Sequence, residues 1–378
     1  MSQEMQKVDF LVIGAGIAGA SVSYWLAPHG RVAILERESQ PGYHSTGRSA
    51  ALYMASYGSE QVRALSLASR DFFDHPPKGF AEHALLTPRG ALMVAGSDQM
   101  DALNDHWSMI SAMGTGASRL TAEEVLALIP VFRPEKIAGG VLEPDAMDMD
   151  VHAIHQGFLR GARQHHAQIQ CNTEVLGIQR DESGWLVKTS TGIWHAAVVI
   201  NAAGAWADQI GHMAGTQSIG LQPCRRSAFT FKPQIESHFE HWPATIGASE
   251  DWYFKPDAGV ILGSPANQDP VEPQDVQPEE LDIALAISRI EEVTTLTVRR
   301  PSHTWAGLRS FVSDKGLVGG VDPQAEGFFW VAAQGGYGIQ TSPAMGEACA
   351  SLVRGLGVPE HIARFGLTAD MLSPKRLY

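Results

Sequence analysis

The stretch from Val8 to Glu36 decides the fold. It opens with Val-Asp-Phe-Leu-Val-Ile-Gly-Ala-Gly-Ile-Ala-Gly and closes with Arg-Val-Ala-Ile-Leu-Glu. The apolar run Phe10–Ile13 is typical of a buried strand, and it meets a turn whose glycines are Gly14, Gly16 and Gly19. A helical segment follows as far as His29, and a second apolar run ends on an acid. The stretch therefore predicts a strand, a glycine turn, a helix and a second strand.

The three glycines have separate physical tasks in such a unit. Gly14 permits the tight turn, Gly16 lets a pyrophosphate come against bare backbone, and Gly19 lets the helix pack closely on the sheet. The N–H groups and the positive end of the helix then face the phosphates. Glu36 at the tip of the second strand can accept hydrogen bonds from ribose hydroxyls, and its charge disfavours a 2′-phosphate. The spacing therefore indicates a dinucleotide site that disfavours NADP.

Length and composition limit the other possibilities. A chain of 378 residues exceeds the size at which one core keeps growing, so we expect two domains. The 44% hydrophobic fraction is ordinary for globular proteins, and the net charge of −13 argues against nucleic acid or an anionic membrane as the main partner. No apolar stretch reaches the roughly 18 residues of a transmembrane span, and we recognise no signal peptide. Wide spacing of the cysteines disfavours disulfides and a metal site and favours a reducing cytoplasm; they are Cys171, Cys224 and Cys349.

Periodicity divides the rest of the chain into helices and strands. Helical spacing covers residues 60–73, 101–113, 122–129, 150–164, 278–293 and 344–354. Strand-like runs occupy residues 85–95, 138–142, 168–178, 185–189, 196–200, 225–231, 245–246, 252–255, 260–263, 317–320 and 328–332. Thr121, with Glu124 three residues on, is expected to cap the helix at 122–129. Small residues gather at 201–208 and 334–343, where backbone can approach a ligand, and at 39–52, which could equally be a solvated loop.

Three of these segments together resemble the flavin-dependent amine and D-amino-acid oxidoreductase family, which includes glycine oxidase, sarcosine oxidase and D-amino-acid oxidase. They are Val8–Glu36, the run Ala-Val-Val-Ile-Asn-Ala-Ala-Gly-Ala-Trp-Ala-Asp at 197–208, and the glycine-rich 334–340. Within the family the chain looks most like the bacterial D-arginine dehydrogenases. That likeness rests on His-Ser-Thr-Gly-Arg-Ser-Ala-Ala at 44–51, Arg-Arg-Ser-Ala-Phe at 225–229, Trp-Ala-Gly-Leu-Arg-Ser-Phe at 305–311 and Phe-Trp-Val-Ala-Ala-Gln-Gly-Gly-Tyr-Gly-Ile-Gln-Thr-Ser at 329–342. It covers nearly the whole chain.

The resemblance implies an α/β fold, with a Rossmann-type FAD-binding domain and an interleaved α+β substrate domain, as in D-amino-acid oxidase. The FAD-binding domain would comprise residues 1–60, 145–222 and 300–378. The substrate-binding domain would comprise residues 61–144 and 223–299. FAD would be bound non-covalently, because relatives with attached flavin use a cysteine on the substrate side and none stands at a matching place here.

The resemblance also carries cofactor contacts onto this chain. Glu36 would bind the adenosine ribose, and Val175 would meet the adenine through its backbone. The segment Gly336–Gln340 would place a helix N-terminus beside the pyrimidine end of the flavin. The cofactor-binding residues expected in this way are Gly14, Ala15, Gly16, Ala18, Gly19, Glu36, Arg37, Ser45, Arg48, Ser49, Ala50, Ala51, Val175, Gly204, Gly336, Tyr337, Gly338, Ile339 and Gln340.

Four residues match the family's substrate site. Arg309 would clamp the substrate carboxylate, a task suited to a planar, permanently charged fork; the alternative is a structural arginine paired with a carboxylate. The hydroxyls of Tyr57 and Tyr253 could orient the carboxylate or the amine, and Arg226 could instead shape the pocket wall. His44 and His303 are possible proton acceptors, although a lone histidine is more often structural. The remaining pocket residues implied by the resemblance are Leu52, Met54, Ala91, Gly336 and Gln340.

One departure from D-arginine dehydrogenase concerns the substrate side chain. Ala91 stands where those enzymes have a glutamate that receives the guanidinium, and Leu52 and Met54 replace a histidine and a threonine. An apolar wall cannot compensate for the desolvation of a cationic side chain, so we expect neutral side chains to be preferred. Glu82 or Glu143 could in principle compensate, although the sequence gives no reason to expect it.

The resulting expectation is a flavin dehydrogenase that oxidises D-amino acids by hydride transfer from Cα to flavin N5, yielding a 2-keto acid and ammonia. The alternatives are an amine or glycine-type oxidase, or a 2-hydroxy-acid dehydrogenase, on the same fold. A non-catalytic flavin- or NAD-binding sensor is a further alternative. The sequence does not identify the electron acceptor; a quinone and an electron-transfer protein are both candidates. The expected location is cytoplasmic, with peripheral contact to the inner membrane as an option.

Overall fold

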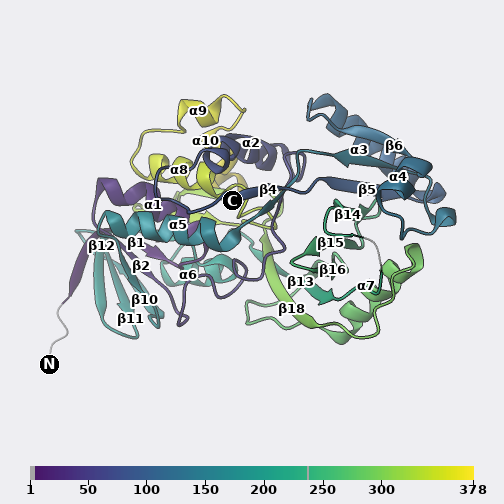
Figure 1. Ribbon diagram of the computed structural model, residues 1–378. Coiled ribbons are helices and arrows are strands. Elements are labelled where there is room, and N and C mark those ends of the chain that lie inside the picture. The colour runs from purple at the N-terminus through teal and green to yellow at the C-terminus, as the bar shows by residue number, and fades with distance from the viewer. Residues whose placement is uncertain (1–4, 236–237) are drawn as a thin grey trace.

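The computed structural model describes residues 5–235 and 238–378, which fold into two lobes that lie side by side (Figure 1). The first lobe is built on an eight-stranded sheet. Strands β9, β2, β1, β12 and β20 run parallel in that order, and β10, β11 and β19 add antiparallel pairs. Their bounds are Gln6–Ile13 (β1), Val32–Leu35 (β2), Gln168–Gln170 (β9), Val175–Arg180 (β10), Trp185–Thr189 (β11), Ile193–Asn201 (β12), Val318–Val321 (β19) and Phe328–Ala332 (β20).

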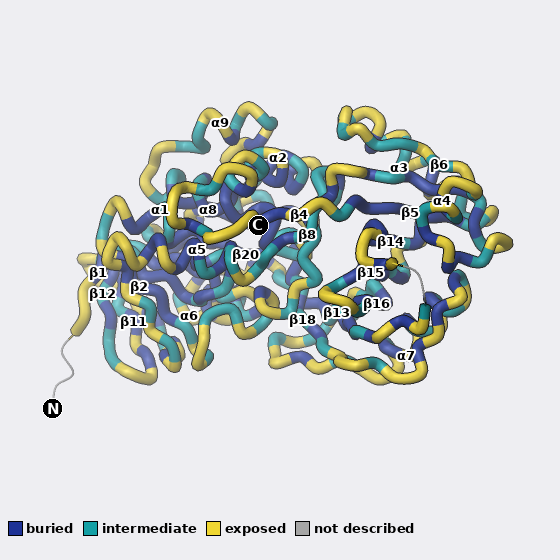
Figure 2. The backbone as a smooth tube through the Cα atoms, in the orientation of Figure 1, coloured by how far each residue is buried: buried dark blue, intermediate teal, exposed yellow. Residues whose placement is uncertain are grey.

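Both faces of this sheet are covered, as the buried colour of its central strands shows (Figure 2). Val12 points into one core, where helices α1, α2, α5 and α8 pack, and its neighbours Leu11 and Ile13 point into another, which contains α6. This alternation is the pattern of a strand buried on both faces. The helices of this lobe are Ile17–Leu26 (α1), Glu60–Asp74 (α2), Val151–Gln164 (α5), Ala207–Met213 (α6), Ser342–Val353 (α8), Glu360–Ala363 (α9) and Ala369–Leu372 (α10).

The second lobe is a nine-stranded mixed sheet. Its order is β17, β13, β16, β15, β14, β5, β7, β6, and β18 pairs with β13. The strands are Ala91–Ala95 (β5), Ser118–Thr121 (β6), Gly139–Glu143 (β7), Gln222–Phe231 (β13), Ala244–Gly247 (β14), Tyr253–Asp257 (β15), Val260–Ser264 (β16), Asp269–Pro270 (β17) and His303–Phe311 (β18). Its helices are Met100–Ala112 (α3), Ala122–Leu128 (α4) and Glu280–Val293 (α7). The capping box predicted for α4 is confirmed, with Thr121 and Glu124 bonded reciprocally.

A three-stranded sheet lies between the lobes. It has the order β3, β8, β4, with bounds Leu52–Tyr53 (β3), Leu86–Pro88 (β4) and Met147–Met149 (β8). An apolar cluster also crosses the interface, where Ala205 and Trp206 of the first lobe meet Val276, Ala306 and Leu308. No helix among the described residues is long and apolar enough to cross a membrane.

The structure corrects several predicted elements. The single strand expected at 85–95 is wrong: Gly90, with a φ of +73°, breaks it into β4 and β5, and the Arg89 and Gly90 N–H groups both bond to the Ala146 carbonyl. Residues 168–178 likewise divide into β9 and β10. Strand β18 was not predicted, because Gly307 and Arg309 interrupt its apolar pattern.

The proposed division into domains would shift at two places. Helix α2, assigned to the substrate domain, packs against α8 and contributes Val62 and Leu65 to the core of the first lobe. Strand β18, assigned to the FAD-binding domain, pairs along its whole length with β13 in the second sheet. The division itself remains a proposal.

Candidate active site

The glycine turn closes against the end of β12. Gly14 has a φ of +100°, and a Cβ there would overlap the carbonyl oxygen of Ala202. A Cβ on Gly19 would overlap the carbonyl oxygen of Gly14, so a larger residue would push α1 away from the turn. The geometry of both positions agrees with the turn and packing tasks expected from the sequence.

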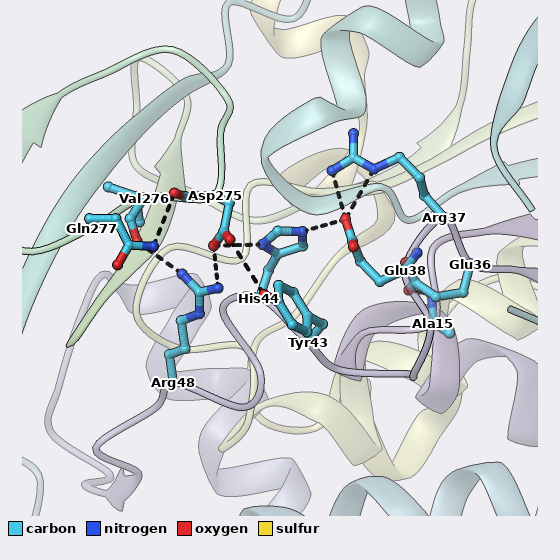
Figure 3. Close-up of polar contacts among 10 residues, drawn as sticks. All are labelled: Ala15, Glu36, Arg37, Glu38, Tyr43, His44, Arg48, Asp275, Val276 and Gln277. Atoms are coloured by element: carbon cyan, nitrogen blue, oxygen red, sulfur yellow. Dashed lines mark hydrogen bonds and ion pairs between the residues drawn. The ribbon is translucent and has the colours of Figure 1, made fainter. Parts of the chain in front are cut away.

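Glu36 holds this turn and also faces the space beside it. Its carboxylate accepts hydrogen bonds from the N–H groups of Ala15 at 2.9 Å and Glu38 at 3.0 Å (Figure 3). Each carboxylate oxygen has capacity for a second donor. Because Glu36 lines the cavity next to the turn, it can fix the loop and accept ribose hydroxyls together.

Two residues that support the turn were missed by the sequence analysis. The Thr46 hydroxyl accepts the Ile17 N–H at 3.0 Å and so satisfies one free donor of α1. His155, on the buried face of α5, lies with Nε2 2.8 Å from the Ala15 carbonyl oxygen. Burial lowers the pKa of His155, so the neutral ring donates this bond. Thr46 lies inside the block at 44–51, but nothing in the sequence separates His155 from an ordinary core residue.

The first cavity, of about 170 Å³, extends from the glycine turn along the carboxyl ends of β1 and β2. The predicted cofactor residues among its walls are Gly14, Gly16, Glu36, Arg37, Ser45, Val175 and Gly204. Four further residues line it: Tyr43, Thr173 and Trp206, which the sequence did not indicate, and His44, which was expected only as a possible proton acceptor. The Arg37 guanidinium lies over the Trp206 ring, 4.5 Å from its centroid, and is positioned over the wall by this cation–π contact.

Charged residues tie the 42–50 segment to the second lobe beside this cavity (Figure 3). Asp275 forms an ion pair with Arg48, accepts from the Tyr43 hydroxyl at 3.4 Å and lies 4.0 Å from His44 Nδ1. The other ring nitrogen of His44 is 2.9 Å from Glu38. Arg48 also donates to the carbonyl oxygens of residues 276 and 306 at 3.0 and 3.1 Å. The Arg48 side chain, expected along the cofactor, is therefore engaged by the second lobe.

The second cavity, of about 100 Å³, begins where the first one ends. Ser45 and Thr46 line both, so the two form one elongated cleft along the 42–50 segment. The predicted cofactor residues here are Ser45, Arg48, Ser49, Ala50, Gly336, Gly338 and Ile339. Three predicted substrate residues, Arg226, Tyr253 and Arg309, close the far end. The cleft thus leads from the ribose-binding acid to the proposed carboxylate clamp.

Two guanidinium groups lie side by side at this end without a counter-charge. Neither Arg226 nor Arg309 forms an ion pair with any carboxylate of the described residues. Arg226 donates to the Asn267 carbonyl oxygen at 2.6 Å, and Arg309 donates to the Tyr57 hydroxyl at 3.5 Å. Burial and the charge of Arg309 hold the pKa of Arg226 below its usual range. Two half-buried cations without an acidic partner create a site for an anion.

Aromatic rings enclose the clamp. Tyr57 and Tyr337 meet edge to face with centroids 5.1 Å apart, and burial raises the pKa of Tyr337 to about 12. A Cβ on Gly336 would lie 2.9 Å from Arg309 Cζ, so the glycine lets the backbone pass directly over the guanidinium. Tyr337 therefore remains a protonated hydrogen-bonding group at physiological pH.

Several predicted pocket residues lie elsewhere. Gln340 is 3% exposed, and its amide is used by the Met54 backbone at 3.2 and 3.3 Å and by the Ser66 hydroxyl at 2.7 Å. Leu52, Met54 and Ala91 do not line the cavity, so their part in substrate selection stays a prediction. Among the predicted cofactor residues, those outside both cavities are Ala15, Ala18, Gly19, Ala51, Tyr337 and Gln340.

The residues present fit FAD. The cleft has an acid at one end for a ribose, bare backbone and a helix N-terminus in the middle, and a second cavity lined by Gly336 and Gly338 toward the other end. None of the three cysteines lines either cavity, in keeping with the expected non-covalent attachment. The described residues contain no cluster of histidine, cysteine, aspartate and glutamate suited to a metal ion.

Comparison with known proteins supports the same assignment. Over its whole length the chain is similar to the glycine oxidase of Geobacillus kaustophilus (strain HTA426), at 24% identity over 96% of this chain and 97% of that protein. The crystal structure of glycine oxidase from this species superposes with a TM-score of 0.83, covering 97% of this chain and 99% of that one. The L-proline dehydrogenase from P. horikoshii superposes with a TM-score of 0.82, at 21% identity, over 99% of this chain and 98% of that one.

A further relative acts on a different class of substrate. The L-2-hydroxyglutarate dehydrogenase of Escherichia coli (strain K12) is 25% identical over 62% of this chain and 56% of its own length. Proteins with this fold thus have names that differ in substrate. The cofactor of this chain is FAD. Residues 9–352 match the family model described as FAD dependent oxidoreductase, and the chain therefore belongs to this family of flavin enzymes, as its sequence had indicated.

Proposed function

We propose that this protein is a D-amino-acid dehydrogenase that deaminates D-amino acids with neutral side chains to 2-keto acids and ammonia. The observation that carries the proposal is the pair of half-buried guanidinium groups of Arg226 and Arg309 at the end of the FAD cleft, which form no ion pair with a carboxylate of the described residues. A carboxylate is the anion that a planar arginine fork binds best. The choice of the D-enantiomer rests on the likeness to D-arginine dehydrogenases.

The roles of the side chains follow from their positions. Arg309 receives the carboxylate, with its guanidinium held by Tyr57 and covered by the Gly336 backbone. Arg226 adds a second positive charge, and Tyr253 offers a hydroxyl beside it. When bound, FAD supplies the acceptor for the hydride that leaves Cα. The substrate amine, once neutral, assists that departure with its lone pair, so that orientation by the clamp provides much of the catalysis.

The preference for neutral side chains rests on Leu52, Met54 and Ala91. They line neither cavity, so this part of the proposal rests on the likeness to D-arginine dehydrogenases. At positions matched to a glutamate, a histidine and a threonine of those enzymes, these apolar side chains offer no counter-charge, and desolvating an ammonium or guanidinium group against them would be costly. A neutral side chain carries no such cost. Selectivity among D-amino acids would then follow size and apolar surface.

The relatives also favour an alternative function, in either of two forms. Glycine oxidase shares the fold, and L-2-hydroxyglutarate dehydrogenase is 25% identical over 62% of this chain. Both names give a substrate that carries a carboxylate. The same arginine pair would bind glycine or a 2-hydroxy acid. An oxidase of the first kind or a dehydrogenase of the second is therefore the alternative.

Product analysis separates these candidates. The purified holoenzyme is incubated with D-leucine, D-alanine, glycine or lactate and an artificial electron acceptor, and 2-keto acid, ammonia and hydrogen peroxide are measured. The proposal predicts equal amounts of keto acid and ammonia from D-amino acids, and little peroxide in air. Peroxide formed in step with keto acid would indicate an oxidase. Keto acid without ammonia from lactate alone would contradict the proposal in favour of a hydroxy-acid dehydrogenase.

A further inference from the structure

A buried acid lies outside the clamp and has no partner. Glu143 ends β7 and is 3% exposed, and neither of its carboxyl oxygens has a hydrogen-bond partner among the described residues. The nearby hydroxyl of Ser56, 2% exposed, is also without one. Two unbonded polar groups facing each other inside a protein are costly unless a small movement joins them.

Charge around Glu143 favours its neutral form. Burial raises the pKa of Glu143, the Ser56 hydroxyl opposes this effect, and Asp145 on the adjoining turn adds to it. Tyr53 on β3 is the other titratable group coupled to the carboxyl, and its own pKa is raised to about 12 by burial. A protonated Glu143 carries an O–H group that can donate to Ser56, whereas an ionised carboxylate would lose its hydration in these apolar surroundings at a large cost in free energy.

The position of Glu143 connects it with the clamp. Strand register pairs Glu143 with Ala91 on β5, then Met93 with Ile246, and Ile246 with Tyr253. Directly paired residues, and those two apart on a strand, share a face of the sheet. Glu143 therefore lies on the sheet face that carries Tyr253.

The turn at 54–58 lies over this part of the sheet. Its ends are held by Gln340, which bonds the Met54 backbone, and by Arg63, which donates to the Gly58 carbonyl oxygen at 2.7 Å. Between them, Ser56 faces Glu143 and the next residue, Tyr57, reaches Arg309. Within the turn, the Tyr57 N–H donates to the Met54 carbonyl oxygen at 3.3 Å, and the Ser56 hydroxyl has no partner among the described residues.

We propose that Glu143 is a positioning residue which, through Ser56, holds Tyr57 against Arg309 and so sets the carboxylate clamp. It touches neither the substrate nor the cofactor in this role. The inference rests on the proposed function, because it takes the clamp to be a carboxylate site. If the proposal holds, substrate binding at the clamp requires that Glu143, which lies far from Arg309 in the sequence, be in its neutral form.

Pyruvate binding to the holoenzyme tests the proposal, followed as a change in flavin absorbance. Glu143→Gln keeps a neutral side chain of the same shape with donors, whereas Glu143→Leu removes the polar group and keeps the volume. We expect Glu143→Gln to bind pyruvate within about twofold of wild type and Glu143→Leu about tenfold more weakly, as for loss of one hydrogen bond to a charged group. Tyr57→Phe should weaken binding by a similar factor.

The double variant Glu143→Leu/Tyr57→Phe gives the decisive readout. If Glu143 acts through Tyr57, the double variant binds pyruvate no more weakly than the weaker single variant. A purely structural role would make the two losses multiply, and that result would overturn the proposal. Wild-type binding should also weaken as pH rises above the usual carboxyl range, while Glu143→Gln shows no such loss; identical pH profiles would contradict it as well.

These experiments distinguish a failure of the Glu143 proposal from a failure of the proposed function. Pyruvate binding by wild type without flavin reduction by any D-amino acid would reject the dehydrogenase assignment, and the double-variant comparison would still decide the role of Glu143. Failure of wild type to bind pyruvate would overturn both.

Discussion

Replacing Arg309 by alanine should weaken substrate capture strongly, because the guanidinium lines the second cavity, is half-buried and has no acidic partner in the described chain. A planar fork can form two charge-assisted hydrogen bonds with a carboxylate, each worth about 1.5–3 kcal/mol. Their loss amounts to about 3–6 kcal/mol. Since Arg226 keeps a positive charge at the site, the lower end applies, which corresponds to binding roughly a hundredfold weaker.

The assay is the KM for D-leucine together with the Kd for pyruvate, both on the holoenzyme. Arg309→Lys keeps the charge without the fork and should fall between wild type and Arg309→Ala. Arg225→Ala is the matched control: Arg225 precedes Arg226 on β13, points to the other face and pairs with Asp269, Glu279 and Asp282. It should lower the melting temperature and leave pyruvate binding intact. Pyruvate binding within about twofold of wild type in Arg309→Ala would refute the clamp.

Three further predictions concern specificity, cofactor retention and pH. Ala91→Glu should raise activity toward D-arginine relative to D-leucine, since it adds a counter-charge; an unchanged ratio would reject the pocket assignment. Asp275→Asn should release FAD several times faster at low salt than wild type, because it breaks the ion pair with Arg48. The control Asp9→Asn breaks the remote ion pair with Arg31 and should release FAD at the wild-type rate. Equal FAD release rates in the two variants would show that the Arg48–Asp275 pair does not help to retain the cofactor. Burial lowers the pKa of His155, so the contribution of this residue to the free energy of unfolding is complete above about pH 6.5 and is lost as pH falls below that value. His155→Gln still donates a hydrogen bond but does not titrate, so its melting temperature should fall less between pH 7 and 5 than that of wild type. A parallel decline in both proteins would contradict this.

The sequence predicted the first lobe well because its signals are local. The glycine turn, the acid at Glu36 and the small residues at 201–208 each describe one strand end, and parallel strands bring such ends to a common edge. The second lobe was predicted less well. Strand β18 carries Gly307 and Arg309 within an otherwise ordinary pattern, and these are functional positions that break local rules.

The candidate site shows the same contrast. Arg226, Tyr253 and Arg309 were predicted through family motifs and do meet at one cavity. His155 and Asp275 were not assigned roles, and Glu143 was named only as an acid that could compensate for a cationic substrate, because each makes its contacts between distant segments that no local pattern records. Gln340 was taken for a pocket residue, yet the structure shows that its amide is engaged by Met54 and Ser66. Whether such a side chain lines the pocket or bonds a distant segment depends on strand register and burial, which only the folded structure shows.

The central claim is tested most directly by anaerobic flavin reduction, followed by absorbance, with paired D- and L-enantiomers of leucine and arginine. The account predicts rapid bleaching by D-leucine, a weak response to D-arginine and none to the L-amino acids. Bleaching by D-arginine in preference to D-leucine would contradict the specificity, and bleaching by L-amino acids alone, or by no amino acid, would contradict the assignment as a D-amino-acid dehydrogenase.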